Sequence, residues 1–167
     1  YSGGGIGTEN AALMAGGTVA APIYAVSRSE EYNGSTWSAT SELNANHDMT
    51  AGVGTQNAGL VIGNNSPTCC ATEEWNGSTW IVGGQLSTGR SYAAGAGTQN
   101  AGLYFGGKVD CVHTEEYNGT AWSETADLIT GRKQLSGAGL QNAALAIGGC
   151  SPSARVTCVE EYDCASW

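Results

Sequence analysis

The sequence predicts an all-β protein, a β-propeller of four blades in a single domain that spans residues 1–167. A segment of acidic, aromatic and turn residues, such as TEEYNGTAW at 114–122, occurs four times. A second segment, such as GTQN at 97–100, precedes each copy, and the two segments recur together at intervals of roughly 43 residues. No apolar period of 3.6 residues is sustained and glycine is abundant, so helices are not expected.

Each repeat is expected to form four short antiparallel strands. In the third repeat, SYAAGAG and AGLYFGG are two small or apolar strands joined by a turn. TEEY and TAWSE then form a hairpin around Asn118 and Gly119, the strongest short hairpin signal. The expected blades cover approximately residues 1–43, 44–86, 87–128 and 129–167.

The hairpin predicts which side chains share a face of the blade. A two-residue turn at the Asn-Gly tip would set Tyr117 opposite Thr120 and Glu115 opposite Trp122. Tyr117, Trp122 and Glu115 then share one face, and Glu116 points the other way. The aromatic pair is expected to pack on the neighbouring blade, because a large ring buries on the order of 150–250 Å². The aromatic positions of the four blades are Tyr32, Trp37, Trp75, Trp80, Tyr117, Trp122, Tyr162 and Trp167.

The acidic pairs are expected to be structural. The first glutamate should accept hydrogen bonds between blades, with Arg90 or Arg132 as donors, and the second should be solvated. His47 occupies the slot that these arginines fill in later repeats, so it is expected to have a structural hydrogen-bonding role. Paired carboxylates also serve glycoside hydrolysis. Four identical copies on framework strands lack the asymmetry of an active site.

Together these positions resemble a kelch repeat, over essentially the whole chain. That pattern has an Arg on the first strand, a Gly pair closing the second, a Tyr on the third and a Trp on the fourth. In the third repeat these positions hold Arg90, Gly106, Gly107, Tyr117 and Trp122. The second repeat departs from the pattern at His47, Asn64 and Trp75. The resemblance implies a β-propeller, in a style similar to kelch-like modules of phage and bacterial surface proteins. Because kelch-like propellers usually have six or seven blades, four blades and part of a larger ring both remain open.

The chain has six cysteines outside the repeat pattern, five of them in the variable segments: Cys69, Cys70, Cys111, Cys150, Cys158 and Cys164. An even number in such segments favours disulfides and an oxidising compartment. Cys150 and Cys158 bracket one segment and are the first expected pair, and Cys69 or Cys70 with Cys111 would join blades 2 and 3. A zinc site is the alternative, but no C-x₂-C spacing occurs. No metal or cofactor is predicted.

All length variation falls between the glycine pair and the acidic pair, at one end of the propeller. Fixed strands with one variable segment are typical of a recognition surface. No catalytic set is visible, so the prediction is a non-enzymatic binding module for a glycan or protein, extracellular or on a virion. An assembly protein, homo-oligomeric or part of a capsid, tail or filament, is one alternative, and an enzyme with a loop-built site is another. The candidate contact residues are Tyr24, Arg28, Asn65, Ser66, Lys108, Asp110, His113, Ser153 and Arg155.

The net charge of the chain limits the classes of partner that are expected. Fifteen acidic against six basic residues give a net charge of −9, which repels phosphate backbones and anionic lipids. Nucleic acid and membrane insertion are therefore not expected, and no apolar run approaches the roughly 18 residues of a membrane span. The start carries neither an initiator Met nor a basic-then-apolar leader, as expected of a mature form or a fragment. Three Asn-Gly tips match the glycosylation sequon, but the hairpin alone explains them.

Overall fold

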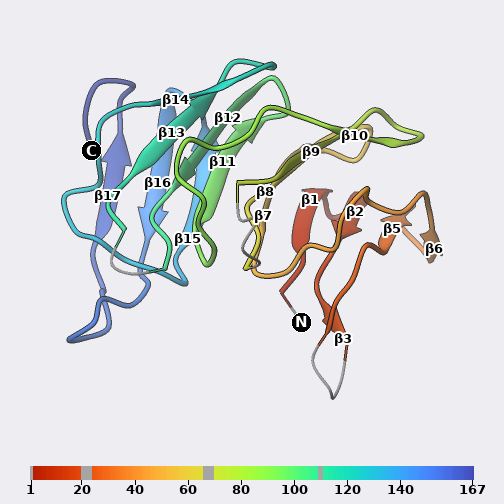
Figure 1. The fold of residues 1–167 in the computed structure, drawn as a ribbon, viewed down its shortest axis with the longest axis horizontal. Coiled ribbons are helices and arrows are strands. Elements are labelled where there is room, and N and C mark those ends of the chain that lie inside the picture. Colours follow the sequence, from red (N-terminus) through yellow and green to blue (C-terminus); the bar gives the residue numbers. More distant parts are fainter. Residues whose placement is uncertain (1, 20–23, 66–69, 109–110) are drawn as a thin grey trace.

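The computed structural model describes residues 2–19, 24–65, 70–108 and 111–167. Within them there is no helix, and the strands form four small antiparallel sheets arranged as the blades of a four-bladed β-propeller, as predicted. In Figure 1 blade 4 lies at the left, blade 1 at the right, and blades 2 and 3 between them.

The order of strands across each blade follows the order along the chain. Blade 1 contains β1 (Gly4–Thr8), β2 (Ala11–Ala15), β5 (Ser29–Tyr32) and β6 (Trp37–Ala39). Blade 2 contains β7 (Ala51–Thr55), β8 (Ala58–Ile62), β9 (Thr72–Trp75) and β10 (Trp80–Val82). Blade 3 contains β11 (Ala94–Thr98), β12 (Ala101–Phe105), β13 (Thr114–Tyr117) and β14 (Trp122–Glu124). Blade 4 contains β15 (Ser136–Leu140), β16 (Ala143–Ile147) and β17 (Val159–Tyr162).

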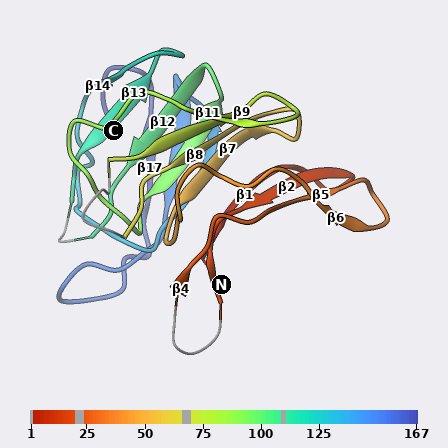
Figure 2. The same ribbon diagram turned by 45° about the vertical axis from the view of Figure 1, so that its right-hand side comes forward.

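Two elements differ from the expected four strands per repeat. Blade 4 has three strands, and Trp167 stands where the fourth strand begins in the other blades. The variable segment of blade 1 adds a small hairpin of β3 (Thr18–Val19) and β4 (Tyr24–Ala25). Figures 1 and 2 show this hairpin projecting from the lower side of the molecule.

The loops of the hairpins at the Asn-Gly tips are longer than predicted. Tyr117 pairs with Trp122, so the loop holds the four residues 118–121 rather than two. The Oδ1 atom of Asn118 accepts hydrogen bonds from the backbone amides two and three residues further on, at 3.0 and 2.9 Å. This Asx turn is what the two-residue prediction missed. The register shifts by two residues and the faces are kept, so Tyr117, Trp122 and Glu115 share a buried face, as predicted.

Neighbouring blades pack through three apolar cores. Each core joins a leucine of one blade to an aromatic residue of the next: Leu13 with Trp75, Leu60 with Tyr117, and Leu103 with Tyr162. All six side chains are buried, so the predicted packing role is confirmed at Trp75, Tyr117 and Tyr162, whereas Trp37 of blade 1 is 50% exposed. Among the described residues no fourth core joins blade 4 to blade 1. The fold is therefore a row of four blades with two uncovered ends.

The glutamine of each GTQN turn adds a polar contact to these interfaces. Gln99 Nε2 donates hydrogen bonds to the backbone oxygens of Gly59 and Trp75 on the preceding blade, at 3.1 and 2.7 Å. Gln56 and Gln141 make the equivalent pair of contacts. These residues were predicted only to form a turn. Their side chains also tie each blade to the one before it.

The tryptophan that opens the fourth strand makes a second recurring contact. Its indole N–H donates to a hydroxyl at the start of the third strand of the preceding blade. The three pairs are Trp80 with Ser29, Trp122 with Thr72 and Trp167 with Thr114, at 3.1, 3.0 and 3.0 Å. In both of these recurring contacts the donor therefore stands on the later blade and the acceptor on the earlier one.

Candidate binding surface

In blades 2, 3 and 4 the first glutamate of the acidic pair anchors the link that leads into its blade, whereas Glu30 of blade 1 is exposed. Glu115 is buried, forms an ion pair with Arg90, and accepts a hydrogen bond from the amide of Ser87 at 2.7 Å. Glu160 forms the equivalent ion pair with Arg132. The predicted donors are confirmed, but each arginine belongs to the link into the glutamate's own blade, so the predicted contact between blades is wrong. These carboxylates belong to the framework rather than to an exposed site.

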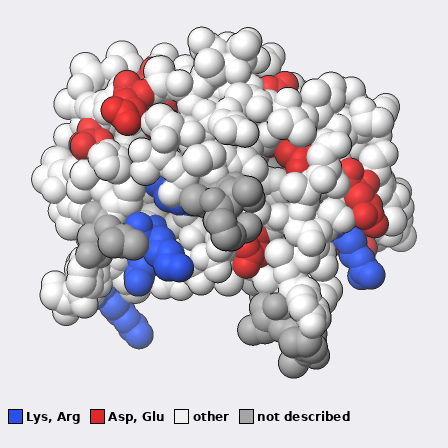
Figure 3. Space-filling view, in the orientation of Figure 1, with Lys and Arg blue, Asp and Glu red and all other residues white. Residues whose placement is uncertain are grey.

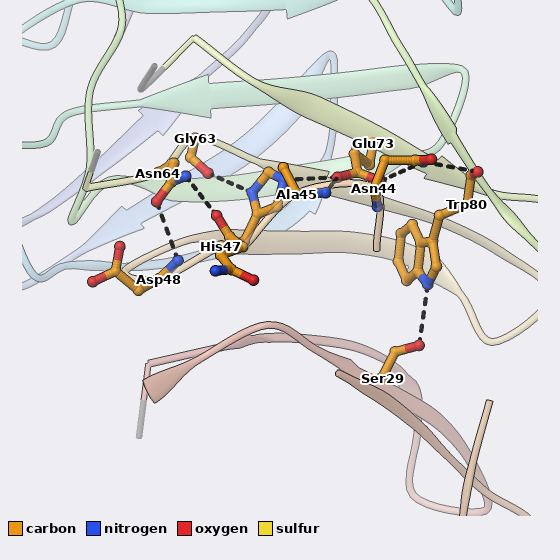
Figure 4. Close-up of polar contacts among 10 residues, drawn as sticks. Ser29, Asn44, Ala45, His47, Asp48, Gly63, Asn64, Glu73 and Trp80 are labelled. Carbon is orange, nitrogen blue, oxygen red and sulfur yellow. Dashed lines mark hydrogen bonds and ion pairs between the residues drawn. The ribbon is translucent and has the colours of Figure 1, made fainter. Parts of the chain in front are cut away.

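His47 takes the place of the arginine in blade 2, as Figure 4 shows. Its two ring nitrogens lie 3.1 Å from the backbone oxygen of Gly63 and 3.0 Å from Oε1 of Glu73. Because both partners are acceptors, only the doubly protonated ring donates to both. Glu73 also accepts hydrogen bonds from the amides of Asn44 and Ala45, at 2.8 and 3.0 Å. The predicted structural role of His47 is confirmed.

The surroundings of Glu73 set the direction of its pKa. Burial acts to raise the pKa of this carboxyl, but the hydrogen bonds from His47 and Asn44 together outweigh burial and leave the pKa below its ordinary value. A lowered pKa in the folded state stabilises the fold above the pKa of an unfolded Glu, about 4.3. That contribution is lost as the pH falls through the folded-state pKa.

We therefore expect Glu73→Gln to lower the free energy of unfolding at pH 7, and the difference from wild type to shrink as the pH falls towards 3. Urea denaturation at a series of pH values measures this difference. Glu161→Gln is the matched control, because Glu161 is an exposed second glutamate in blade 4, and it should follow wild type throughout. A difference for Glu73→Gln that stays constant from pH 7 to pH 3 would contradict the assignment.

In blades 2 and 3 the second glutamate is not simply solvated, which corrects the prediction, whereas Glu161 of blade 4 is exposed as predicted. Glu74 accepts a hydrogen bond from the hydroxyl of Tyr117, and Glu116 accepts one from Tyr162 at 2.9 Å. Burial, together with these hydrogen bonds, raises the pKa of both tyrosines to about 12. The side chain does point away from its own blade's buried face, as predicted. The hydroxyl that reaches it comes from the next blade, which the pattern of a single repeat cannot show.

The variable segments and the links between blades lie at the same end of the propeller, here called the loop end. Its described parts are residues 16–19, 24–28, 40–50, 63–65, 70–71, 83–93, 106–108, 111–113, 125–135 and 148–158. Seven of the candidate contact residues are exposed there: Tyr24, Arg28, Asn65, Lys108, His113, Ser153 and Arg155. The other two, Ser66 and Asp110, lie outside the described residues.

Asn65 and Lys108, from the variable segments of blades 2 and 3, are brought together. Oδ1 of Asn65 lies 3.4 Å from Nζ of Lys108 and accepts a hydrogen bond from the hydroxyl of Ser91 at 3.3 Å. The amide of Asn65 donates to Oδ1 of Asp48 at 3.2 Å. A polar patch thus spans the boundary between two blades.

His113 lies apart from this patch. Its Nδ1 atom is 3.5 Å from Oδ1 of Asp127, and both side chains are about half exposed. Among the residues that the structure describes, no three His, Cys, Asp or Glu side chains gather in a way that could hold a metal ion.

All six lysines and arginines lie at the loop end. Arg90 and Arg132 are buried in ion pairs, which leaves four at or near the surface: Arg28, Lys108, Lys133 and Arg155. Figure 3 shows the blue side chains of this face towards its lower side, where the loop end lies. Sequence reasoning picked out three of these residues one at a time. It missed their segregation, although the framework segments visibly lack Lys and Arg.

The predicted disulfides are not formed. Cys150 and Cys158 are free thiols, and so is Cys164. Cys111 is also a free thiol, so it is bonded to neither Cys69 nor Cys70, and Cys69 itself lies outside the described residues. Burial raises the pKa of the Cys111 thiol. In blade 4 the side chain of Arg132 donates to Cys158 Sγ at 3.3 Å, a contact that no cysteine spacing predicts.

The comparisons with known proteins do not identify a family for this chain. No protein-family model matches this chain, and no curated protein matches it. The kelch resemblance therefore stays a prediction, while the four-bladed propeller is shown by the structure. In the described part of the chain, no helix has the length and apolar character needed to cross a membrane.

Proposed function

We propose that the protein is a non-catalytic recognition module, extracellular or on a virion surface, whose loop end binds an acidic glycan or an acidic protein surface. The observation that carries this proposal is the segregation of every Lys and Arg to one end of a chain with a net charge of −9. The loop end also holds Glu42, Asp48 and Asp127, so its four surface cations offer an anionic ligand separate charged contacts that no other part of the molecule has.

The framework beneath this surface supports the same function. Buried ion pairs at Glu115 and Glu160 hold the links between blades, so the loop end rests on fixed backbone. The contact of Lys108 with Asn65 places side chains of two blades within reach of one ligand, which supports the proposal. Contacts supplied by several rigid elements favour specific binding.

The first test compares wild type with a variant that carries Arg28→Gln, Lys108→Gln and Arg155→Gln. We expect wild type to bind immobilised carboxylated or sulfated glycans, or an acidic peptide, in preference to neutral glycans. Binding should weaken as salt is raised. The triple variant should bind about tenfold more weakly, because three exposed charge contacts contribute a few tenths to 1 kcal/mol each.

The matched control changes the net charge equally at the opposite end. Ser35→Glu, Ser78→Glu and Thr120→Glu alter exposed residues at the three Asn-Gly tips, and this variant should bind like wild type. Equal losses in the two triple variants would mean that binding follows overall charge. Equal binding to acidic and neutral ligands would overturn the proposal.

A structural assembly protein is a second candidate. It is favoured by the two uncovered end faces of the row of blades, since such faces bury apolar surface only when another molecule packs on them.

A further inference from the structure

The face of blade 1 that points away from blade 2 is built like an interface but has nothing packed on it. Gly52, Gly95 and Gly137 occupy one position of the repeat, and a Cβ atom at each would lie within 3 Å of atoms in the preceding blade. Gly5 occupies the same position in blade 1, and a Cβ atom there would meet nothing within 4 Å. Trp37 is 50% exposed, whereas the equivalent Trp80, Trp122 and Trp167 pack on a preceding blade.

The opposite face of blade 4 shows the complementary pattern. Ile147 is 39% exposed, whereas Ile62 and Phe105, at the same repeat position, are fully buried beneath the next blade. Val159 is 52% exposed, at the position where Thr72 and Thr114 receive an indole N–H. The same interface occurs three times inside the molecule. Its later-blade half is exposed on blade 1, and its earlier-blade half is exposed on blade 4.

The end faces nevertheless do not match each other. Glu9 stands where Gln56, Gln99 and Gln141 donate two hydrogen bonds to backbone oxygens of the preceding blade. A carboxylate cannot donate to those oxygens and would repel them. Val159 cannot accept the indole N–H that Trp37 presents. If blade 4 packed on blade 1, both recurring polar contacts would be missing from that interface.

We propose that the exposed face of blade 4 is a docking surface for a further blade of this repeat that carries the turn glutamine, and that Glu9 and Val159 prevent the chain's own blade 1 from docking there. The partner blade on blade 4 brings the turn glutamine and the tyrosine that reach the backbone and Glu161. It needs no indole donor opposite Val159.

The test repairs both mismatches and measures self-association. The variant with Glu9→Gln and Val159→Thr gives the two end faces the missing donor and acceptor. We expect it to associate head to tail at least tenfold more tightly than wild type, as measured by sedimentation velocity over a concentration series. Both residues are exposed, so the far-UV circular dichroism of the monomer should not change. Adding Trp37→Ala to this variant should abolish the gain, since Trp37 contributes the docking indole.

Each other outcome overturns the proposal. A repaired variant that associates no more tightly than wild type would mean that the end faces do not dock blades. Wild type that self-associates as tightly as the repaired variant would mean that Glu9 and Val159 exclude nothing. A gain that survives Trp37→Ala would place the contact elsewhere. None of these results depends on the exposed cations of the loop end, so docking and ligand binding can fail separately.

Discussion

Replacing Arg90 with Met is expected to lower the free energy of unfolding by about 3–5 kcal/mol, because it leaves a buried carboxylate without its cation. Glu115 is fully buried, and Arg90 is its ion-pair partner. The same guanidinium donates to the backbone oxygens of Gly106 and Tyr104, at 3.1 and 2.8 Å, and lies over the ring of Tyr104. Urea denaturation at pH 7 measures the loss.

Two further variants separate the causes. Arg28→Met removes an exposed arginine and should change stability by no more than about 0.5 kcal/mol. Combining Arg90→Met with Glu115→Gln should recover part of the loss, because the unpaired charge is then gone. If the double variant is no more stable than Arg90→Met alone, the loss comes from packing and the backbone contacts, and the buried charge is not its cause.

Gly137→Ala is expected to destabilise the protein by about 2–3 kcal/mol through overpacking. A Cβ atom at Gly137 would lie 2.3 Å from the backbone oxygen of Gly95 and 2.9 Å from the ring of Phe105. Neither neighbour can move without separating blades 3 and 4. Gly137 has no positive φ, so backbone strain does not contribute to the loss. Thermal and urea denaturation both report the change.

Gly5→Ala is the matched control, at the same position of the repeat. Nothing lies within 4 Å of a Cβ atom there, so stability should be unchanged or slightly raised. The pair of variants also reports on the ends of the row in solution. If Gly5→Ala destabilises as much as Gly137→Ala, then another blade covers the face of blade 1 in the purified protein.

The fold could be predicted because the repeat constrains it several times over. The constant intervals inside each repeat, from the turn glycine to the glycine pair and from the acidic pair to the tryptophan, are compatible with four similar blades and with little else. The faces of Tyr117, Trp122 and Glu115 followed from the period of two along a strand, which a two-residue change of register leaves intact. The loop length did not follow, because an Asn-Gly pair fits both a two-residue turn and a four-residue Asx turn.

The contacts between blades were the part that sequence reasoning could not supply. A repeat aligned with itself shows that Gln99 and Glu116 recur, but not that their partners stand on neighbouring blades. The disulfide prediction was wrong because it took closeness in sequence as a sign of bonding. Cys150 and Cys158 are close in sequence, yet both are free thiols, and Arg132 donates a hydrogen bond to the sulfur of Cys158. The candidate loop residues could be placed at one end from the spacing alone, because their segments were the only ones to vary in length.

The one-way arrangement of donors and acceptors gives the row of blades a direction, like that of a polymer with a head and a tail. Any blade with the turn glutamine and the fourth-strand tryptophan fits behind any blade with the third-strand hydroxyl. Duplication or deletion of blade 2 or blade 3 in the coding sequence therefore leaves every remaining joint matched. Blade number can change one unit at a time during evolution without redesign of the neighbours, as in other repeat proteins. Glu9 and Val159 are the two positions at which this interchangeability stops.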